Sequence, residues 1–267
     1  MKHALPSALL SLVSVFAFAD AMTAAAGNAG KAAAGLSDAD KALSADWVGK
    51  VSLGHDSRRG NTDKDAFSAA GELAKLEGDW VVRLAADGAW EETTTTDDEG
   101  VESKDQTVGN AHGNANVKRR FDGFFFYADF DAAHDATAGL KYRLVESLGL
   151  GTYLVDTDEV KFFVEAGPAY VEEKLDETDD YFALSASERC EWRPVGHPGV
   201  AIFEDCNGLW DMDDSDRYVL HGEAGVDVPV LDRLSLTVKG VWEYTAQPAA
   251  GKEKEDRQIL TQLSYVF

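Results

Sequence analysis

The chain has 267 residues, of which 48 are acidic and 25 are basic, so its formal net charge at pH 7 is −23. This acidity argues against nucleic acid and against anionic membrane surfaces as direct partners, because both bind basic protein surfaces. Beyond the N-terminal segment, no apolar run approaches the roughly 18 residues that a membrane-spanning helix needs, whereas aromatic residues and glycine are frequent. If the chain spans a membrane, it therefore does so with β-strands.

The N-terminal segment has the pattern of a secretory signal peptide. A short basic stretch at residues 1–3 is followed by an apolar run at residues 4–19, which is interrupted only by Pro6 and three serines. Alanines near the end of this run provide A-x-A cleavage sites, so we predict a signal peptide over residues 1–21. The alternative, an N-terminal membrane anchor, requires a longer uninterrupted apolar run. Residues 22–46 are rich in Ala and Gly, which predicts a periplasmic linker.

Residues 47–267 predict an antiparallel, up-and-down barrel of about ten β-strands, with twelve as the alternative count. In the clearest strand, apolar residues with Trp80 and Trp90 at the two ends occupy every second position, which is typical of an outward face that crosses a bilayer. Residues 107–118 alternate Asn, His and Lys with small residues, which predicts a polar inward face. The predicted strands are 47–56, 66–76, 80–91, 107–118, 124–131, 138–154, 160–171, 218–228, 234–244 and 257–267.

The connections between these strands predict the topology. The turns at 77–79, 119–122, 155–158 and 229–232 are short, whereas the intervening connections are 57–64, 92–105, 134–136, 174–215 and 246–255. Four of these five are long and three are strongly acidic. Bacterial barrels alternate short periplasmic turns with longer external loops. We therefore predict a monomeric barrel in the outer membrane of a Gram-negative cell, with both termini periplasmic and acidic loops outside.

The last strand supports closure of the barrel. Counting back from the terminal Phe267, every second residue suits an apolar surface and polar residues lie between them. An exposed strand that ends on an aromatic residue would be a sticky edge unless it pairs with the first strand. This ending resembles the closing strand that outer-membrane proteins present to their assembly machinery. The resemblance implies an assembly signal at Tyr265 and Phe267, with that machinery and outer-membrane lipid as partners.

Both cysteines, Cys190 and Cys206, lie in the predicted external loop 174–215 with 15 residues between them. In a chain exported to an oxidising compartment, this arrangement predicts a disulfide. The chain-entropy model assigns such a loop roughly 3 kcal/mol of stabilisation. The alternative is a metal site or catalytic thiol that includes His197.

Charged residues on the predicted inward faces form the candidate site. Antiparallel pairing about a turn near Ala136 would place Asp131 opposite Lys141 and Asp129 opposite Arg143. In a narrow barrel, opposite charges typically form a satisfied polar plug, and a narrow conducting path is the alternative. The predicted lumen ionic network is Asp129, Asp131, Lys141, Arg143, Glu165, His221, Glu223, Lys239 and Glu243.

Catalysis is the competing class of function. His221 and Glu223 share an inward face, and His112 lies on another, but no serine stands at an obvious spacing from them. We therefore assign no catalytic residue and keep an outer-membrane lipid or peptide hydrolase as the alternative.

A run of aspartates, Asp211, Asp213, Asp214 and Asp216, is spaced like the start of a calcium loop. The glycine required at the sixth position is missing, and Gly222 stands where a bidentate glutamate is needed. We predict no formal calcium loop and no resident cofactor. Loosely bound Ca²⁺ or Mg²⁺ is the alternative to a solvated acidic surface.

Glu146 and Gly149 interrupt the apolar alternation of the predicted strand 138–154. Either a bulge resets the alternation, or Glu146 lies outside the hydrocarbon layer, because a lipid-facing carboxylate at mid-depth costs a few kcal/mol.

Short motifs, in order along residues 47–267, resemble a known family. They are 47–54, 60–63, 120–127, 140–143 with the preceding Asp135, 148–153 and 164–170. They resemble the salt-induced outer-membrane proteins, a domain of unknown function, although the segment 174–215 and the acidic loops depart from that pattern. The resemblance implies an outer-membrane barrel without catalytic residues to transfer. We expect a structural or envelope-stress protein, or a narrow pore, with acidic loops that bind cations.

Overall fold

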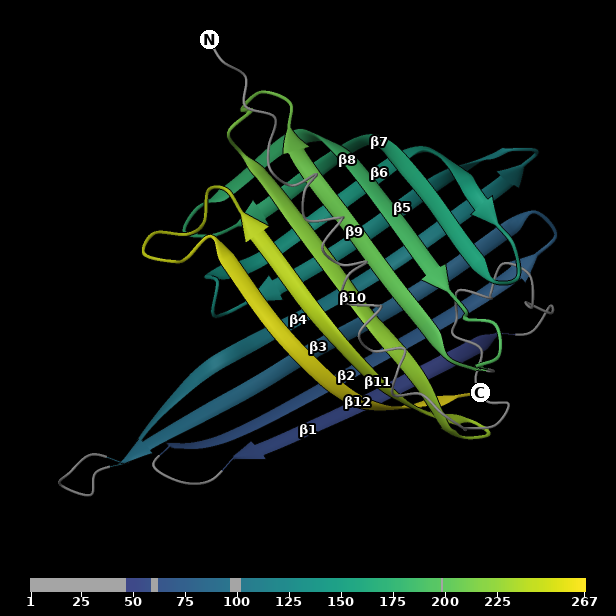
Figure 1. Cartoon of the computed structure of the whole chain (residues 1–267). Coiled ribbons are helices and arrows are strands. Elements are labelled where there is room, and N and C mark those ends of the chain that lie inside the picture. The colour runs from purple at the N-terminus through teal and green to yellow at the C-terminus, as the bar shows by residue number, and fades with distance from the viewer. Residues whose placement is uncertain (1–46, 59–61, 97–101, 198) are drawn as a thin grey trace, which may run out of the picture.

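The computed structural model describes residues 47–58, 62–96, 102–197 and 199–267, so the predicted signal peptide and linker lie outside the described residues. The described strands form one closed barrel in which each strand pairs antiparallel with its sequence neighbours and the first pairs with the last (Figure 1). In the described part of the chain, no helix is long and apolar enough to cross a membrane. The strands are β1 (Val48–Arg58), β2 (Thr62–Glu77), β3 (Trp80–Thr96), β4 (Glu102–Phe121), β5 (Phe124–Asp135), β6 (Leu140–Asp156), β7 (Val160–Lys174), β8 (Thr178–Trp192), β9 (Ala201–Asp211), β10 (Tyr218–Leu231), β11 (Leu234–Thr245) and β12 (Glu255–Val266).

The predicted all-β, up-and-down barrel is confirmed, with the higher of the two expected strand counts. The additional strands are β8 and β9, which occupy most of the segment expected as the external loop 174–215. The many acidic residues of this segment led us to predict a loop. They are compatible with strands because the positions that face the lumen accept charged side chains. The connection between β8 and β9, residues 193–200, lies at the opposite end of the barrel from the predicted loop.

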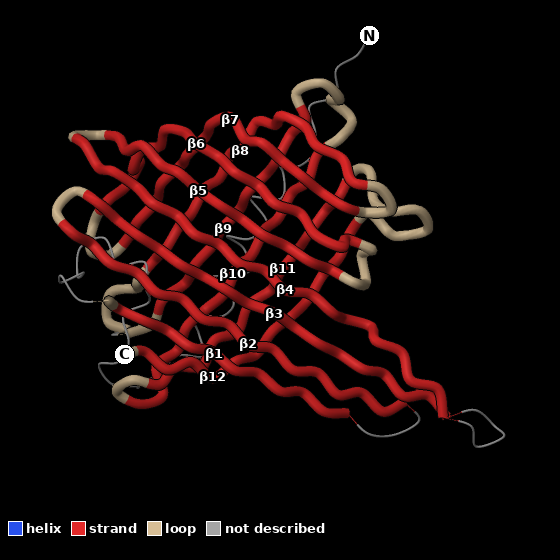
Figure 2. The backbone as a smooth tube through the Cα atoms, turned by 180° about the vertical axis from the view of Figure 1, so that it is seen from behind, coloured by secondary structure: helices blue, strands red, loops and turns tan. Residues whose placement is uncertain are grey.

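The barrel has two different ends. We call the end that carries the start of β1 and the last residues of β12 the terminal end, and the other the loop end. Apart from 193–200, the terminal-end turns are short, at 78–79, 122–123, 157–159 and 232–233. At the loop end β3 runs to Thr96 and β4 starts at Glu102, so much of the predicted loop 92–105 is paired strand. Figure 2 shows β2, β3 and β4 extending well past the barrel body.

The outer face carries exposed aromatic side chains near both ends. We define the terminal belt as Trp80, Phe121, Phe124, Trp192, Tyr265 and Phe267 and the loop belt as Phe67, Trp90, Phe130, Tyr170, Phe182 and Trp210. Exposed leucines lie between the belts at Leu84, Leu148, Leu150, Leu184, Leu236 and Leu263. An apolar band between two aromatic belts is what a bilayer-spanning barrel presents to lipid.

Glu146 lies on this outer face at the level of the loop belt. It is exposed, and its partners across the sheet are Phe130 on β5 and Tyr170 on β7. The register between β6 and β7 is regular from Tyr142 to Ser147, so no bulge resets the alternation there. Of the two alternatives, a bulge or a position outside the hydrocarbon layer, the structure supports the second. Glu146 lies at the edge of the apolar band rather than at its centre.

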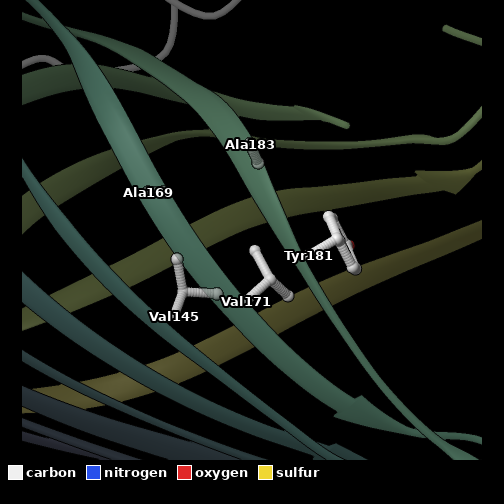
Figure 3. Packing of buried hydrophobic residues seen from close by; sticks show 5 residues of the cluster. All are labelled: Val145, Ala169, Val171, Tyr181 and Ala183. Atoms are coloured by element: carbon white, nitrogen blue, oxygen red, sulfur yellow. The ribbon is translucent and has the colours of Figure 1, made fainter. Parts of the chain in front are cut away.

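Part of the lumen is packed with apolar side chains. Towards the loop end, Val145, Val171 and Tyr181 from three neighbouring strands are buried together (Figure 3). Towards the terminal end, the fully buried Phe125 packs against Tyr153 and Phe163, with ring centroids 5.3 and 5.9 Å away. This aromatic cluster fills space that a wider barrel would leave to water.

The aromatic cluster depends on a glycine. A Cβ atom added at Gly151 would lie 2.2 Å from the Phe125 ring. We therefore expect Gly151→Val to displace the ring and to lower the free energy of unfolding by about 1–3 kcal/mol, as overpacking does. Urea titration of the folded barrel in lipid vesicles, followed by tryptophan fluorescence, measures the change. Gly71→Val is the matched control, because no atom lies within 4 Å of its added Cβ. Equal losses in both variants would contradict the packing argument.

Candidate functional site

The inward-facing side chains form ionic networks at three levels of the lumen. At mid-barrel, His112 of β4 lies between two aspartates, with Nδ1 3.1 Å from Asp87 of β3 and Nε2 2.5 Å from Asp131 of β5. The side chains of His112 and Asp87 are 40% and 47% exposed although they face inward, so water reaches this level. Asp87 also lies within electrostatic reach of Lys239 and His221 from the facing strands β11 and β10. The lumen is therefore narrow here but not dry.

Among the described residues, the partners of the Asp129 carboxylate are amides rather than cations. The carboxylate accepts hydrogen bonds from the side-chain amides of Asn114, at 2.6 Å, and Asn116, at 2.9 Å. The inward asparagines predicted on 107–118 thus serve as donors to the acids of the next strand.

The predicted pairs Asp131 with Lys141 and Asp129 with Arg143 are wrong. Asp131 lies opposite Val145, and Asp129 lies opposite Ser147. The hairpin turn spans 136–139 and a register shift follows Ala133, so β6 is displaced from the position that a tight turn near Ala136 would give. As a result Lys141 is exposed and does not belong to the lumen network.

Towards the terminal end, two ion pairs connect strands that are not neighbours. Lys50 of β1 lies 2.7 Å from Asp227 of β10, which β12 and β11 separate from it in the sheet. Lys118 of β4 lies 2.7 Å from Glu165 of β7, and both side chains are nearly buried. The Lys118 ammonium also lies 3.9 Å from the centre of the Phe163 ring. These pairs cross the interior of the barrel instead of following the sheet.

Towards the loop end, arginines join strands across the lumen. Arg143 of β6 contacts Glu173 of β7 at 2.9 Å and Glu243 of β11 at 3.9 Å. Arg217, in the connection between β9 and β10, contacts Glu173 at 2.7 Å and lies 3.8 Å from the centre of the Tyr181 ring. Arg143, Glu173 and Arg217 are therefore three linked charges above the buried apolar side chains.

A further set of pairs lines the wall near mid-barrel. Lys239 Nζ lies 2.6 Å from Glu223 Oε2. Both side chains face inward, as the alternation of the sequence predicts. Other pairs here are Arg83 with Glu72 at 3.2 Å and Arg189 with Asp205 at 3.7 Å. The predicted network missed the charged residues Glu72, Glu173, Arg189, Asp205 and Arg217. Alternation with Tyr181, Ala183 and Ser185 would have placed Arg189 inward, had 178–192 been recognised as a strand.

The closing strand is fastened at the terminal end. Gly49 and Phe267 exchange backbone hydrogen bonds of 3.0 and 2.9 Å, and Ser52 Oγ lies 2.7 Å from Ser264 Oγ. The Phe267 ring covers Gly49, because a Cβ added there would lie 2.2 Å from it. Tyr265 and Phe267 stack on the outer face with ring centroids 6.4 Å apart. Their role as an assembly signal stays a prediction.

The aspartate run forms a capped turn. Asp211 is buried and accepts the backbone N–H groups of Asp213, at 2.7 Å, and Asp214, at 3.1 Å. The Gln247 side chain donates to Asp214, and with the N–H of Asp216 it lowers the pKa of the Asp214 carboxyl. These hydrogen bonds account for the shape of the turn. Weak cation binding at Asp213 and Asp216, which are exposed, stays a prediction.

The two cysteines lie on neighbouring strands rather than in one loop, and both are free thiols. Cys190 stands opposite Glu204 and Cys206 opposite Glu188, so the thiols are diagonal neighbours. Diagonal positions are about 7–8 Å apart, beyond the roughly 4.4–6.8 Å between the Cα atoms of a disulfide. The predicted disulfide is therefore absent between these described residues.

The same four residues form a polar patch on the outer face, between Trp192 of the terminal belt and Trp210 of the loop belt. In the described part of the chain, the side chains of Glu188, Glu204 and Cys206 are the group whose ligand atoms lie close enough together for one metal ion. His197, considered with the cysteines from sequence, is not in that group.

The buried pair across the lumen generates a stability prediction. Lys118→Met leaves Glu165 as an uncompensated charge, so we expect the free energy of unfolding to fall by about 3–5 kcal/mol. Urea titration in vesicles measures the loss. The control is Lys104→Met, whose exposed pair with Glu92 at 2.8 Å should contribute less than about 1 kcal/mol. The double variant Lys118→Met, Glu165→Leu should recover much of the loss, and a double variant as unstable as the single one would argue against the ionic explanation.

Comparison with known proteins places the chain in a family and shows similar barrels. No curated protein matches the sequence. Similar solved structures include an outer membrane channel from Pseudomonas putida F1, with TM-score 0.47, 10% identity and coverage of 83% of this chain and 95% of that chain. The translocator domain of the autotransporter NalP from Neisseria meningitidis has TM-score 0.44, 11% identity and coverage of 97% and 99%. The outer membrane channel DcaP of Acinetobacter baumannii has TM-score 0.40, 10% identity and coverage of 83% and 95%. A family model described as "Protein of unknown function, DUF481" matches residues 51–267, and the chain belongs to that family.

Proposed function

We propose that the protein is a structural barrel of the Gram-negative outer membrane whose lumen is closed at rest by ion pairs. The observation that carries this proposal is the set of pairs that connect non-neighbouring strands through the interior. They are Lys50 with Asp227, Lys118 with Glu165, and Arg143 with Glu243. The diameter of a barrel grows with its strand number, so a twelve-stranded interior is closed only where side chains meet across it, and satisfied polar networks make such contacts rigid.

Three features support the membrane assignment. The outer face has an apolar band between two aromatic belts, residues 1–21 are predicted to form a signal peptide, and the Tyr265 and Phe267 rings stack on the outer face beside the closing strand. Apart from the connection 193–200, the turns at the terminal end have two or three residues, which supports a periplasmic position for both termini. We further propose a monomer that contacts the barrel-assembly machinery and outer-membrane lipid and binds divalent cations weakly at its acidic loops. A role in envelope or salt stress rests on the family resemblance alone.

A narrow path for small cations is the second candidate. The observation that favours it is the water-accessible middle of the lumen, where His112 and Asp87 are 40% and 47% exposed. Asp87, Asp129 and Asp131 supply acidic groups at this level. A hydrolase gains less support, because the hydrogen bonds of His112 go to two carboxylates rather than to a nucleophile.

Conductance across planar lipid bilayers separates the first two candidates. We expect the purified barrel to insert without stepwise currents over a wide voltage range, because ion pairs occupy the interior near both ends. Lys118→Gln, Glu165→Gln removes one pair and is expected to produce measurable steps, whereas Lys104→Gln, outside the lumen, is not. Stepwise currents from the unaltered protein would overturn the closed-lumen proposal in favour of the narrow pore.

Labelling of intact cells tests the orientation. In a Cys190→Ser, Cys206→Ser background, we expect Ser215→Cys at the loop end to react with a membrane-impermeant maleimide in intact cells. Asp232→Cys at the terminal end should react only after the outer membrane is permeabilised. Both positions are exposed, so accessibility within the fold does not limit either reaction. The reverse order of labelling would contradict periplasmic termini.

A further inference from the structure

The barrel closes between β1 and β12, and this junction is paired over a shorter stretch than any other. Residues 50–53 of β1 pair with residues 263–266 of β12. Among the described residues, every other pair of neighbouring strands shares at least ten residue pairs. Beyond residue 53, β1 stays paired with β2 as far as Arg58. Likewise β12 is paired with β11 from Glu255 onward.

Two strand edges therefore diverge towards the loop end, and we call the region between them the open seam. Its edges are residues 54–58 of β1 and 255–262 of β12, and Figure 1 shows the two strands running apart. We call the point where the β1–β12 pairing ends the apex of the seam. The two strands are still in contact there, because a Cβ added at Gly54 would lie 2.7 Å from the carbonyl oxygen of Thr261. Gln262 Nε2 also reaches Ser68 Oγ of β2 at 3.1 Å. Past this point the described residues of the two edges share no ladder pairs.

Part of the β12 edge lies within the apolar band. Tyr265 of the terminal belt stands on one side of it, and Trp242, opposite Arg257, stands on the other. Between them Ile259 is 82% exposed, the largest fraction among the exposed large apolar side chains of the described residues. Lipid tails offer neither donors nor acceptors to backbone N–H and C=O groups, so an unpaired edge at this depth is costly.

The chain's own first strand is directed away from this edge. Extending the register of β1 and β12 would bring His55 opposite Thr261. Instead the His55 ring lies on the Phe67 ring of β2, with centroids 4.5 Å apart. β1 follows the sheet of β2, β3 and β4, which leaves the barrel body towards the loop end (Figure 2).

We propose that the open seam binds an extended polypeptide strand, which adds antiparallel to β12 along residues 255–262. A polypeptide backbone supplies the alternating donors and acceptors that this edge requires. The β12 side chains define the ligand chemistry. Beside Ile259 and Thr261 the bound strand directs apolar side chains to lipid, and beside Gln258 and Gln262 it directs polar side chains to the lumen. This strand-acceptor function goes beyond a structural barrel.

A direct binding measurement tests the proposal. The probe is a fluorescent synthetic peptide with the sequence of residues 48–58, which already pairs with β12 at the apex and has the required alternation. We expect it to bind the full-length barrel in phospholipid nanodiscs, measured by fluorescence anisotropy. The same peptide with every second backbone nitrogen methylated keeps its side chains but loses donors, so its affinity should fall at least about tenfold. Equal affinity of both peptides would overturn the proposal.

A disulfide engineered across the seam provides the matched control. In the Cys190→Ser, Cys206→Ser background, the variant His55→Cys, Thr261→Cys places two thiols where the extended register would join the edges. Oxidation should close the seam and weaken peptide binding at least about tenfold, and reduction should restore it. Peptide binding that is equally strong with the seam oxidised and reduced would contradict a seam site.

Hydrogen exchange keeps the test decisive if that disulfide does not form. The β12 amides that face the seam, those of residues 257, 259 and 261, should exchange faster than amides 263 and 265, which face β1, and should become protected when the peptide is added. Protection already present without peptide would show the seam closed and overturn the proposal. A photoreactive residue at position 259 should crosslink to the peptide. Crosslinks to lipid alone, or to a second copy of the barrel, in the presence of peptide would assign the seam to those occupants and overturn the peptide assignment.

Discussion

The need to satisfy every backbone hydrogen-bonding group in apolar surroundings is the constraint on which this structure depends. A sheet meets it by closing on itself, so the last strand must find the first. Closure then assigns each residue to one of two faces, and the alternation of the sequence follows from that assignment. The contacts of Gly49 with Phe267 and of Ser52 with Ser264 meet this requirement at the terminal end, whereas the open seam leaves it unmet along part of β12.

The lumen shows how a narrow barrel accommodates the polar face that closure creates. Its charges pair partly along the wall and partly across the interior, and Phe125 with its aromatic neighbours packs beside Lys118. Buried ion pairs add little net stability relative to apolar packing, but removing one partner is costly. The arrangement therefore specifies which strands face one another more than it strengthens the fold.

The inward and outward faces could be predicted from sequence because they depend only on parity. Trp80 to Trp90 and the asparagines of β4 lie as their alternation indicates. Register could not be predicted in the same way, because the turn at 136–139 and one bulge moved the partner of Asp131 from Lys141 to Val145. The partner of Lys118 could not be predicted either, since contacts across the lumen depend on barrel diameter and strand tilt. The strands β8 and β9 were predicted as a loop because their segment is rich in acidic residues. Arg189 and Asp205 nevertheless face the lumen there, as polar residues do on the other strands.

The polar patch of Glu188, Cys190, Glu204 and Cys206 has a consequence for how the barrel sits among lipids. On β3 the apolar outward positions continue from Trp80 to Trp90, whereas on β8 they are interrupted after Ala186. The hydrophobic height of the barrel is therefore unequal around its circumference. A bilayer of uniform thickness meets such a mismatch by thinning beside the shorter side or by letting the barrel tilt. The surrounding membrane is thus expected to be deformed on one side only, which gives the barrel a preferred direction in the membrane plane.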